Sequence, residues 1–292
     1  MEVRALSSAQ NPCYNSRMTK TALTKNQNGT ITFDLVLPKD KIAAEYEKVL
    51  AEVAKTAQIK GFRPGKAPLK MVEAQTDKSR LFSHVLDHLL SPAYSDVIIE
   101  NKLNPLVEPQ VIPKSMEEGK DWTLAVTVAV SPEVELGEYE KYVKAALTKH
   151  AKDHQEEEPK DDKAKEAARD HKLNVIFDSL LKEAKLTVSP LLIEEEAKSA
   201  LSRLVTQLKS LKLTVEDYAK SVKKTTDELV KEYKETAETN LKLEFILQKL
   251  IELQKPEITD EAIAELKPQK GQEGYAKYVL QKRAVLDKLA AL

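Results

Sequence analysis

The stretch Gly61-Phe62-Arg63-Pro64-Gly65-Lys66-Ala67-Pro68 separates two segments whose apolar residues recur at helical spacing. Its two glycines and two prolines favour a stiff, tight loop over a helix or a strand. Such a loop holds one aromatic ring, on Phe62, and two cations, on Arg63 and Lys66, where a partner can touch them. The sequence therefore predicts an exposed binding loop between two helices.

Basic residues collect around this loop, although the whole chain has a formal net charge of only −1. Between Glu52 and Glu73 the sequence has no acidic residue, and its basic residues there are Lys55, Lys60, Arg63, Lys66 and Lys70. A basic loop with one apolar anchor suits docking on a surface of phosphate and protein, and does not suit catalysis. Taken alone, the same residues also fit a sharp turn between helices that binds nothing.

The segments on both sides of the loop, residues 18–146, predict a mixed α and β domain. Thr30–Leu37 alternates apolar and polar residues and predicts a strand, joined by a turn to a shorter strand at Thr21–Lys25. Two more strands are predicted at Leu106–Ile112 and Asp121–Val130. We therefore expect a small antiparallel sheet packed on helices, which makes this an α+β domain.

Two helical regions flank the loop in this domain. The first is expected to begin at Asp40, which can cap it. The second runs from about Leu69 to Lys102, with Leu81, Val85, Leu89 and Val97 facing inward. Pro92 is expected to break, kink or restart this second region, because proline lacks the backbone N–H.

The C-terminal part of the chain, residues 173–292, predicts an all-α, elongated domain of several helices with protruding arms. Ser189-Pro190 is typical of a helix start, and Thr225 with Glu228 forms a capping box before a long helix. That helix is expected to bury Leu229, Phe245, Ile246, Leu250 and Leu253. Between the two domains, residues 147–172 are densely charged and predict a solvated linker or the exposed start of a helix.

The loop also resembles a known sequence. The pattern Gly-Phe-Arg-x-Gly-Lys-x-Pro between two helices resembles the ribosome-docking signature of bacterial trigger factor, a family of ribosome-associated chaperones. Ser131–Tyr139 resembles the segment that leaves the ribosome-binding domain of that family, and Lys224–Leu266 resembles helices of its chaperone domain. The matches come in the family's order and favour the binding role of the loop over the simple turn.

The resemblance implies a function for the chain. It implies ATP-independent docking near the ribosomal exit tunnel, in the cytoplasm and without a cofactor, and shielding of hydrophobic segments of nascent chains. The implied contact residues are Gly61, Phe62, Arg63, Pro64, Gly65 and Lys66. The implied partners are tunnel-exit protein, rRNA and unfolded nascent polypeptides, and a weak homodimer off the ribosome is left open. Residues that bind clients are not identified by the sequence.

The chain departs from the family in one place. Typical trigger factors carry a prolyl isomerase domain between their two other domains, but here residues 147–172 offer neither the length nor the apolar pattern for it. We therefore expect the chain not to be an enzyme. The alternatives are a prolyl isomerase with a reduced catalytic domain, and a holding chaperone that never meets a ribosome.

Other sequence features favour no catalytic or metal site. The pairs His84 with His88 and His150 with His154 have helical spacing. No third ligand stands near the first pair, and the second pair lies in the charged linker, so we expect no metal at either. The single cysteine, Cys13, excludes an internal disulfide. The near-neutral charge argues against DNA, and no apolar run is long enough to span a membrane. Residues 1–17 lack any apolar pattern and predict a disordered extension before a start at or after Met18, with no secretory signal.

Overall fold

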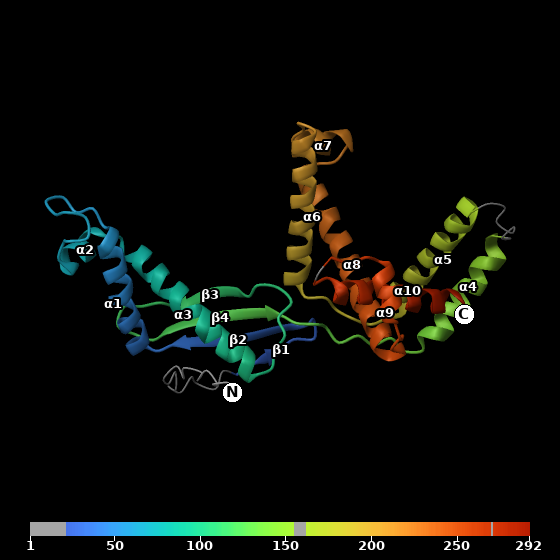
Figure 1. Ribbon diagram of the computed structural model, residues 1–292, viewed down its shortest axis with the longest axis horizontal. Coiled ribbons are helices and arrows are strands. Elements are labelled where there is room, and N and C mark those ends of the chain that lie inside the picture. Colours follow the sequence, from blue (N-terminus) through green and yellow to red (C-terminus); the bar gives the residue numbers. More distant parts are fainter. Residues whose placement is uncertain (1–21, 155–161, 270) are drawn as a thin grey trace, which may run out of the picture. The chain divides into compact units, whose positions relative to one another are not determined.

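The computed structural model describes residues 22–154, 162–269 and 271–292 (Figure 1). The expected extension at residues 1–17 lies outside them. The chain divides into two compact units. The first contains Thr32–Leu103 and Val111–Val126, and the second contains Lys25–Ile31, Asn104–Gln110 and Thr127–Leu292.

A four-stranded antiparallel sheet has the order β1 (Thr24–Lys25), β2 (Thr30–Leu37), β4 (Trp122–Ala129), β3 (Gln110–Ser115). The predicted alternation is confirmed, because Phe33 and Leu35 on β2 and Leu124 and Val126 on β4 are all buried. The strand β3 begins later than expected. Pro109 directly precedes it, and a proline cannot donate a hydrogen bond within the sheet.

The first unit packs helices α1 (Lys39–Thr56) and α3 (Lys78–Glu100) on the sheet (Figure 1). Leu81, Val85, Leu89 and Val97 of α3 are buried as predicted. The ring of Phe82 meets the edge of Trp122 from β4, with 5.5 Å between ring centroids. These contacts make one apolar layer between the helices and one face of the sheet.

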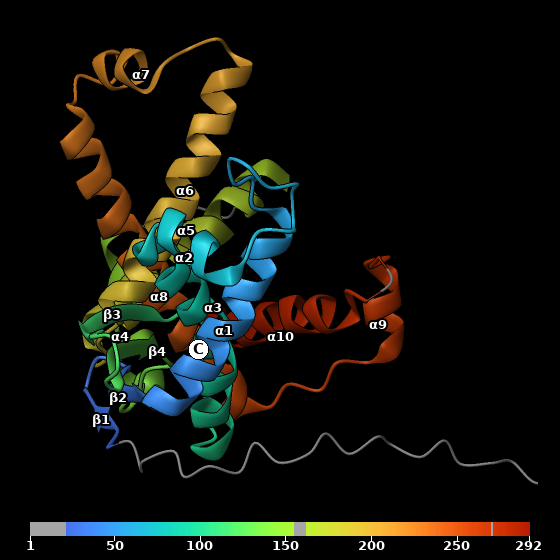
Figure 2. The same cartoon turned by 90° about the vertical axis from the view of Figure 1, so that its left-hand side faces the viewer.

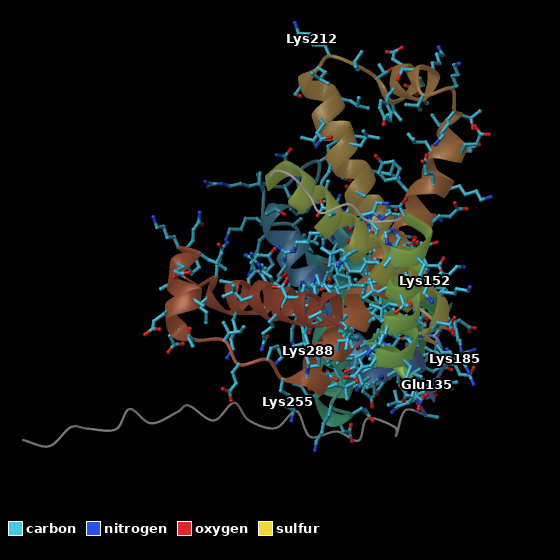
Figure 3. All side chains as sticks on the ribbon, turned by 90° about the vertical axis from the view of Figure 1, so that its right-hand side faces the viewer. Glu135, Lys152, Lys185, Lys212, Lys255 and Lys288 are labelled. Carbon is cyan, nitrogen blue, oxygen red and sulfur yellow. The ribbon has the colours of Figure 1, made fainter. Side chains whose placement is uncertain are left out.

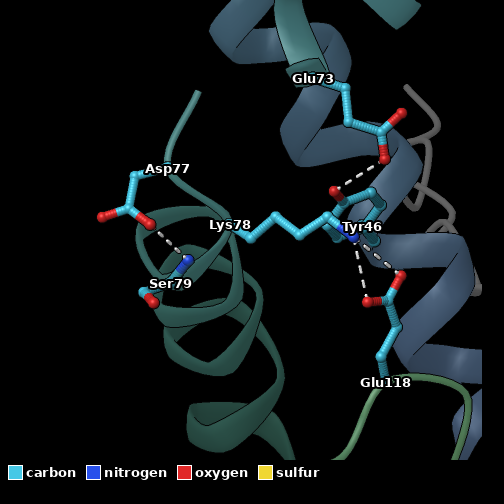
Figure 4. Close-up of polar contacts among 6 residues, drawn as sticks. All are labelled: Tyr46, Glu73, Asp77, Lys78, Ser79 and Glu118. Atoms are coloured by element: carbon cyan, nitrogen blue, oxygen red, sulfur yellow. Dashed lines mark hydrogen bonds and ion pairs between the residues drawn. The ribbon is translucent and has the colours of Figure 1, made fainter. Parts of the chain in front are cut away.

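Two predicted helix boundaries in this unit were wrong. Helix α1 begins at Lys39 after Pro38, so Asp40 lies in the first turn and does not cap the helix. The second helical region breaks at Thr76, between α2 (Leu69–Gln75) and α3, whereas α3 continues through Pro92. The Asp77 side chain accepts a hydrogen bond from the Ser79 backbone N–H at 2.9 Å, which starts a new helix there (Figure 4).

The second unit is helical apart from the sheet ends. Its helices are α4 (Tyr139–His154), α5 (Asp162–Glu183), α6 (Pro190–Ser210), α7 (Val215–Ser221), α8 (Thr226–Gln254), α9 (Asp260–Glu265) and α10 (Glu273–Ala290). Side chains of α4, α5, α8 and α10, including Val143, Ile176, Leu250 and Val285, form its main core. The charged stretch after residue 146 is therefore helical on both sides of residues 155–161, and α4 already begins before it.

Helices α6 and α8 form the two limbs of an arm, with α7 across their outer ends (Figure 2). Leu204, Leu208 and Leu229 make the small core of this arm. The predicted capping box at the start of α8 is confirmed, with reciprocal hydrogen bonds between Thr225 and Glu228. Leu253, expected inside, is 55% exposed, because the last turn of α8 meets the main core with its Leu250 and Ile251 side and turns Leu253 away from it.

Ser189 precedes Pro190 at the start of α6, as predicted, but its side chain makes no cap hydrogen bond. Its buried Oγ instead accepts a hydrogen bond from Thr30 Oγ1 at 3.1 Å. Nearby, Glu135 and Lys185 exchange two backbone hydrogen bonds of 3.0 Å (Figure 3). These bonds join the segment after β4 to the segment before α6 within the second unit.

Lysines take left-handed backbone angles just after five helices of the described part of the chain. They are Lys102, Lys212, Lys223, Lys255 and Lys267, with φ between 43° and 57°. This is the position where helices most often place glycine. None of the described helices is long and apolar enough to cross a membrane.

Candidate docking loop

The sequence-predicted loop is exposed between α1 and α2. Gly61, Phe62, Arg63, Pro64, Gly65 and Lys66 are all exposed, and the Phe62 side chain is 40% accessible. Two turns shape the loop: the Phe62 backbone N–H donates to the Ile59 carbonyl at 3.0 Å, and the Lys66 N–H donates to Arg63 at 2.9 Å. The buried side chain of Ile59 anchors the loop to its unit.

Both loop glycines have left-handed backbone angles, with φ of 92° at Gly61 and 77° at Gly65. Gly65 has a second constraint, because a Cβ atom there would lie 2.8 Å from the Lys55 carbonyl oxygen. At Gly61 a Cβ would meet nothing within 4 Å. The path of the loop therefore requires glycine most strongly at Gly65, where the chain passes close to the end of α1.

The cations of the loop are unpaired within the described residues. The side chains of Lys60, Arg63 and Lys66 have no hydrogen-bond or ion-pair partner there, and neither do those of Lys55 and Lys70. An unpaired guanidinium can form two parallel hydrogen bonds with a carboxylate or a phosphate. The electrostatic surface of the loop is thus positive and available to an anionic partner.

Sequence reasoning missed two apolar residues beside the loop. Leu69 and Met71 at the start of α2 are 48% and 42% exposed, whereas Val72 is fully buried. The sequence carried no clear signal for this, because the break at Thr76 that makes α2 short was itself not predicted. Phe62, Leu69 and Met71 give this end of the unit an apolar component next to its cations.

Helix α2 is held against α1 by a polar contact. The Tyr46 hydroxyl donates to Glu73 Oε1 at 3.0 Å (Figure 4). Partial burial, and then the bond to the Glu73 carboxylate, raises the pKa of Tyr46 to about 12. At the start of α3, Lys78 Nζ pairs with Glu118 Oε2 at 3.1 Å, which ties that end of α3 to the turn before β4 (Figure 4).

The histidine pairs do not form a three-ligand site among the described residues. His88 Nδ1 lies 3.0 Å from Glu45 Oε1, and the pKa of Glu45 is lowered, first by the hydrogen bond from Lys48 and then by that from His88. His150 Nε2 lies 3.1 Å from Nδ1 of His171 on α5, a partner that the sequence did not suggest. The side chain of His154 is outside the described part.

Family models match most of the chain. The model described as bacterial trigger factor protein matches residues 18–163, and the one described as bacterial trigger factor protein C-terminus matches residues 138–269. The chain belongs to the trigger factor family. The matched parts are thus the N-terminal and C-terminal parts of trigger factor.

Curated trigger factors match over part of the chain. The trigger factor of Listeria welshimeri is 37% identical over 111 residues, which is 38% of this chain and 26% of the relative. That of Lactobacillus acidophilus is 34% identical over 116 residues, which is 40% of this chain and 26% of the relative. The match thus spans about a quarter of the length of these relatives.

The fold also matches a solved trigger factor. That structure comes from a study of promiscuous substrate recognition in folding and assembly activities of the trigger factor chaperone. It is similar with a TM-score of 0.61 over 94% of this chain and 99% of that chain, at 12% sequence identity. This likeness covers both the α+β unit and the helical unit and confirms the predicted fold class.

Proposed function

We propose that this trigger factor family member is an ATP-independent, cytoplasmic chaperone that docks on the ribosome and shields hydrophobic segments of nascent chains. Residues 18–146 would dock, and residues 173–292 would hold the client. The observation that carries the docking role is the exposed loop whose cations are unpaired within the described residues, in a chain of this family. The contact is assigned to Gly61 through Lys66, with tunnel-exit protein and rRNA as partners.

The chemistry of the loop fits both kinds of partner surface. The Phe62 ring can fill a small apolar pocket on a protein, and Leu69 and Met71 can widen that contact. Arg63 and Lys66 can pair with carboxylate or phosphate. Binding through phosphate releases counterions, so the affinity should fall as salt rises.

The test is co-sedimentation with 70S ribosomes at two salt concentrations. Phe62→Ala with Arg63→Ala should lower the affinity about thirtyfold, since truncating two such anchors commonly costs about 2 kcal/mol or more. Both side chains are outside any core, so the melting temperature should stay within about 2 °C.

The matched control is Ile112→Ala with Lys114→Ala, which removes an exposed apolar side chain and an exposed cation from β3 of the same domain. This control should sediment like the wild type. Sedimentation of the loop variant at the wild-type level would reject the docking role. Loss of binding only together with unfolding would make the loop a structural turn.

A further inference from the structure

Two histidines meet across helices α4 and α5 of the second unit. His150 Nε2 on α4 lies 3.1 Å from His171 Nδ1 on α5, and the two ring centroids are 4.6 Å apart, with the ring planes tilted by 49°. The two residues are 21 positions apart in the sequence, so the packing of α4 on α5 brings them together (Figure 1). The proposed chaperone function assigns them no role.

The pair lies just beyond the apolar contacts that hold α4 and α5 in place. Leu147 and Leu173 pack against the main core of the second unit, and His150 comes three residues after Leu147, whereas His171 comes two residues before Leu173. The side chain of His150 is half-buried and that of His171 is exposed. A small ion from solution can therefore reach both rings, while the core keeps the two helices beside each other.

The two nitrogens are spaced much as two ligands of one metal ion are. Zinc binds histidine nitrogen at about 2.0–2.1 Å, so two nitrogens on a tetrahedral zinc ion stand about 3.3 Å apart. The observed 3.1 Å needs only a small opening, which rotation of the rings about their broad terminal torsions provides. Without an ion, one neutral ring donates its N–H to the other. When the ion binds, that ring carries its proton on its other nitrogen, so no net proton is released.

We propose that His150 and His171 bind one divalent transition-metal ion of the class that imidazole prefers, represented by Zn²⁺. No third ligand of the usual kind joins them among the described residues, so water fills the remaining positions. The expectation of no metal considered pairs on a single helix, whereas this site takes one ligand from each of two helices. Since half the ligands of a structural zinc site are present, we expect a dissociation constant on the order of 10 μM.

An ion held by both rings joins α4 to α5 beyond their shared core. Opening of this end of the helix pair breaks the site, so Zn²⁺ stabilises the closed form by mass action. At ten times its dissociation constant, Zn²⁺ should slow hydrogen exchange of the amides in residues 148–152 and 168–172 by about elevenfold where exchange depends on that opening.

The test is isothermal titration of the full, metal-free chain with ZnCl₂, and with MgCl₂ for comparison, because Mg²⁺ prefers oxygen ligands. The wild type should bind one Zn²⁺ at this site and no Mg²⁺ there. His171→Ala should weaken this binding roughly tenfold or more, as should His150→Ala with His171→Ala, because a single imidazole cannot chelate the ion. Nitrogen-15 NMR of the wild type should show Zn²⁺ shifting His150 Nε2 and His171 Nδ1, a readout that needs no substitution.

The matched control is His84→Ala with His88→Ala, which removes two histidines from α3 of the first unit, where His88 pairs with Glu45. It should bind Zn²⁺ like the wild type. Wild-type binding by His150→Ala with His171→Ala, or an equal loss in the control, would place the ion elsewhere and overturn the proposal. Absence of Zn²⁺ binding to the wild type, or of a shift at the two nitrogens, would reduce the contact to a hydrogen bond between imidazoles. None of these outcomes affects the docking role, which the sedimentation experiment tests separately.

Discussion

Single residues decide how the docking loop is shaped, and its two glycines have unequal roles. Both need a left-handed backbone, which costs other residues about 1 kcal/mol or more. Only Gly65 also lies against a backbone atom, the Lys55 carbonyl oxygen. The path of the loop therefore depends on the close contact between Gly65 and the Lys55 carbonyl, which leaves no room for a side chain at position 65.

We expect Gly65→Ala to weaken ribosome binding at least tenfold, because the loop must move away from Lys55 and carry Arg63 with it. Gly61→Ala meets open space, so it should lower affinity less than threefold through backbone strain alone. Co-sedimentation of the two variants provides the comparison, with proteolysis of the loop as a check on its order. Equal effects of the two substitutions would show that the contact with Lys55 has no role in binding.

Helices and strands were predictable where local pattern and burial agree. The alternation of Thr30–Leu37 and the capping box of Thr225 and Glu228 were both placed correctly, because each is encoded within a few residues. A break at Pro92 was expected, but α3 continues through it. The burial of Leu89 and Ala93 on either side of Pro92 stabilises the helix by more than the loss of one backbone N–H donor costs. Asp77 was overlooked as a cap because the apolar pattern continues past it.

The candidate site was predictable in part. The loop follows from its glycines and prolines, but the exposure of Leu69 and Met71 depends on where α2 ends, and that boundary is set by Asp77. The pairing of α6 with α8 in the arm was not predictable, because the apolar pattern of one helix does not say which other helix it packs against.

Helix α2 should loosen from α1 at high pH. Tyr46 has a folded-state pKa of about 12, above its ordinary value of 10, so its contribution to stability is present below pH 10 and is lost as pH rises toward 12. Tyr46→Phe removes this dependence. Melting temperatures measured from pH 8 to 11.5 should therefore fall more steeply for the wild type than for the variant. Parallel curves would mean that Tyr46 ionises equally easily in the folded and unfolded states.

At the scale of the molecule, the chain joins the N-terminal and C-terminal parts of trigger factor through α4 and α5, where typical members carry a further domain. Helices α4 and α5 extend into the charged stretch from either side, and they pack on the main core through Val143 before it and Ile176 after it. The expected boundaries at residues 146 and 172 thus fall inside helices. The two family-model matches overlap here, at residues 138–163, which supports the expectation from the sequence that no isomerase domain stands between the two parts.

We expect no acceleration of Xaa-Pro isomerisation in a short peptide by the full chain. The measurement is a protease-coupled assay, with a trigger factor that has its isomerase domain as the positive control. A rate well above background that co-purifies with the chain through two columns would favour the reduced-isomerase alternative. A rate that disappears on purification would come from a contaminant.

The lysines that follow five helices hold a local strain that their other properties offset. Each holds a backbone conformation that glycine adopts without strain, and replacing one with glycine would trade about 1 kcal/mol of strain against a more flexible unfolded chain and a lost positive charge at the helix end. These three contributions are of similar size, so glycine at any one of these helix ends should change the melting temperature little. The strained backbone angles at these helix ends are therefore tolerated at little net cost in stability, and no buried side chain takes part in that balance.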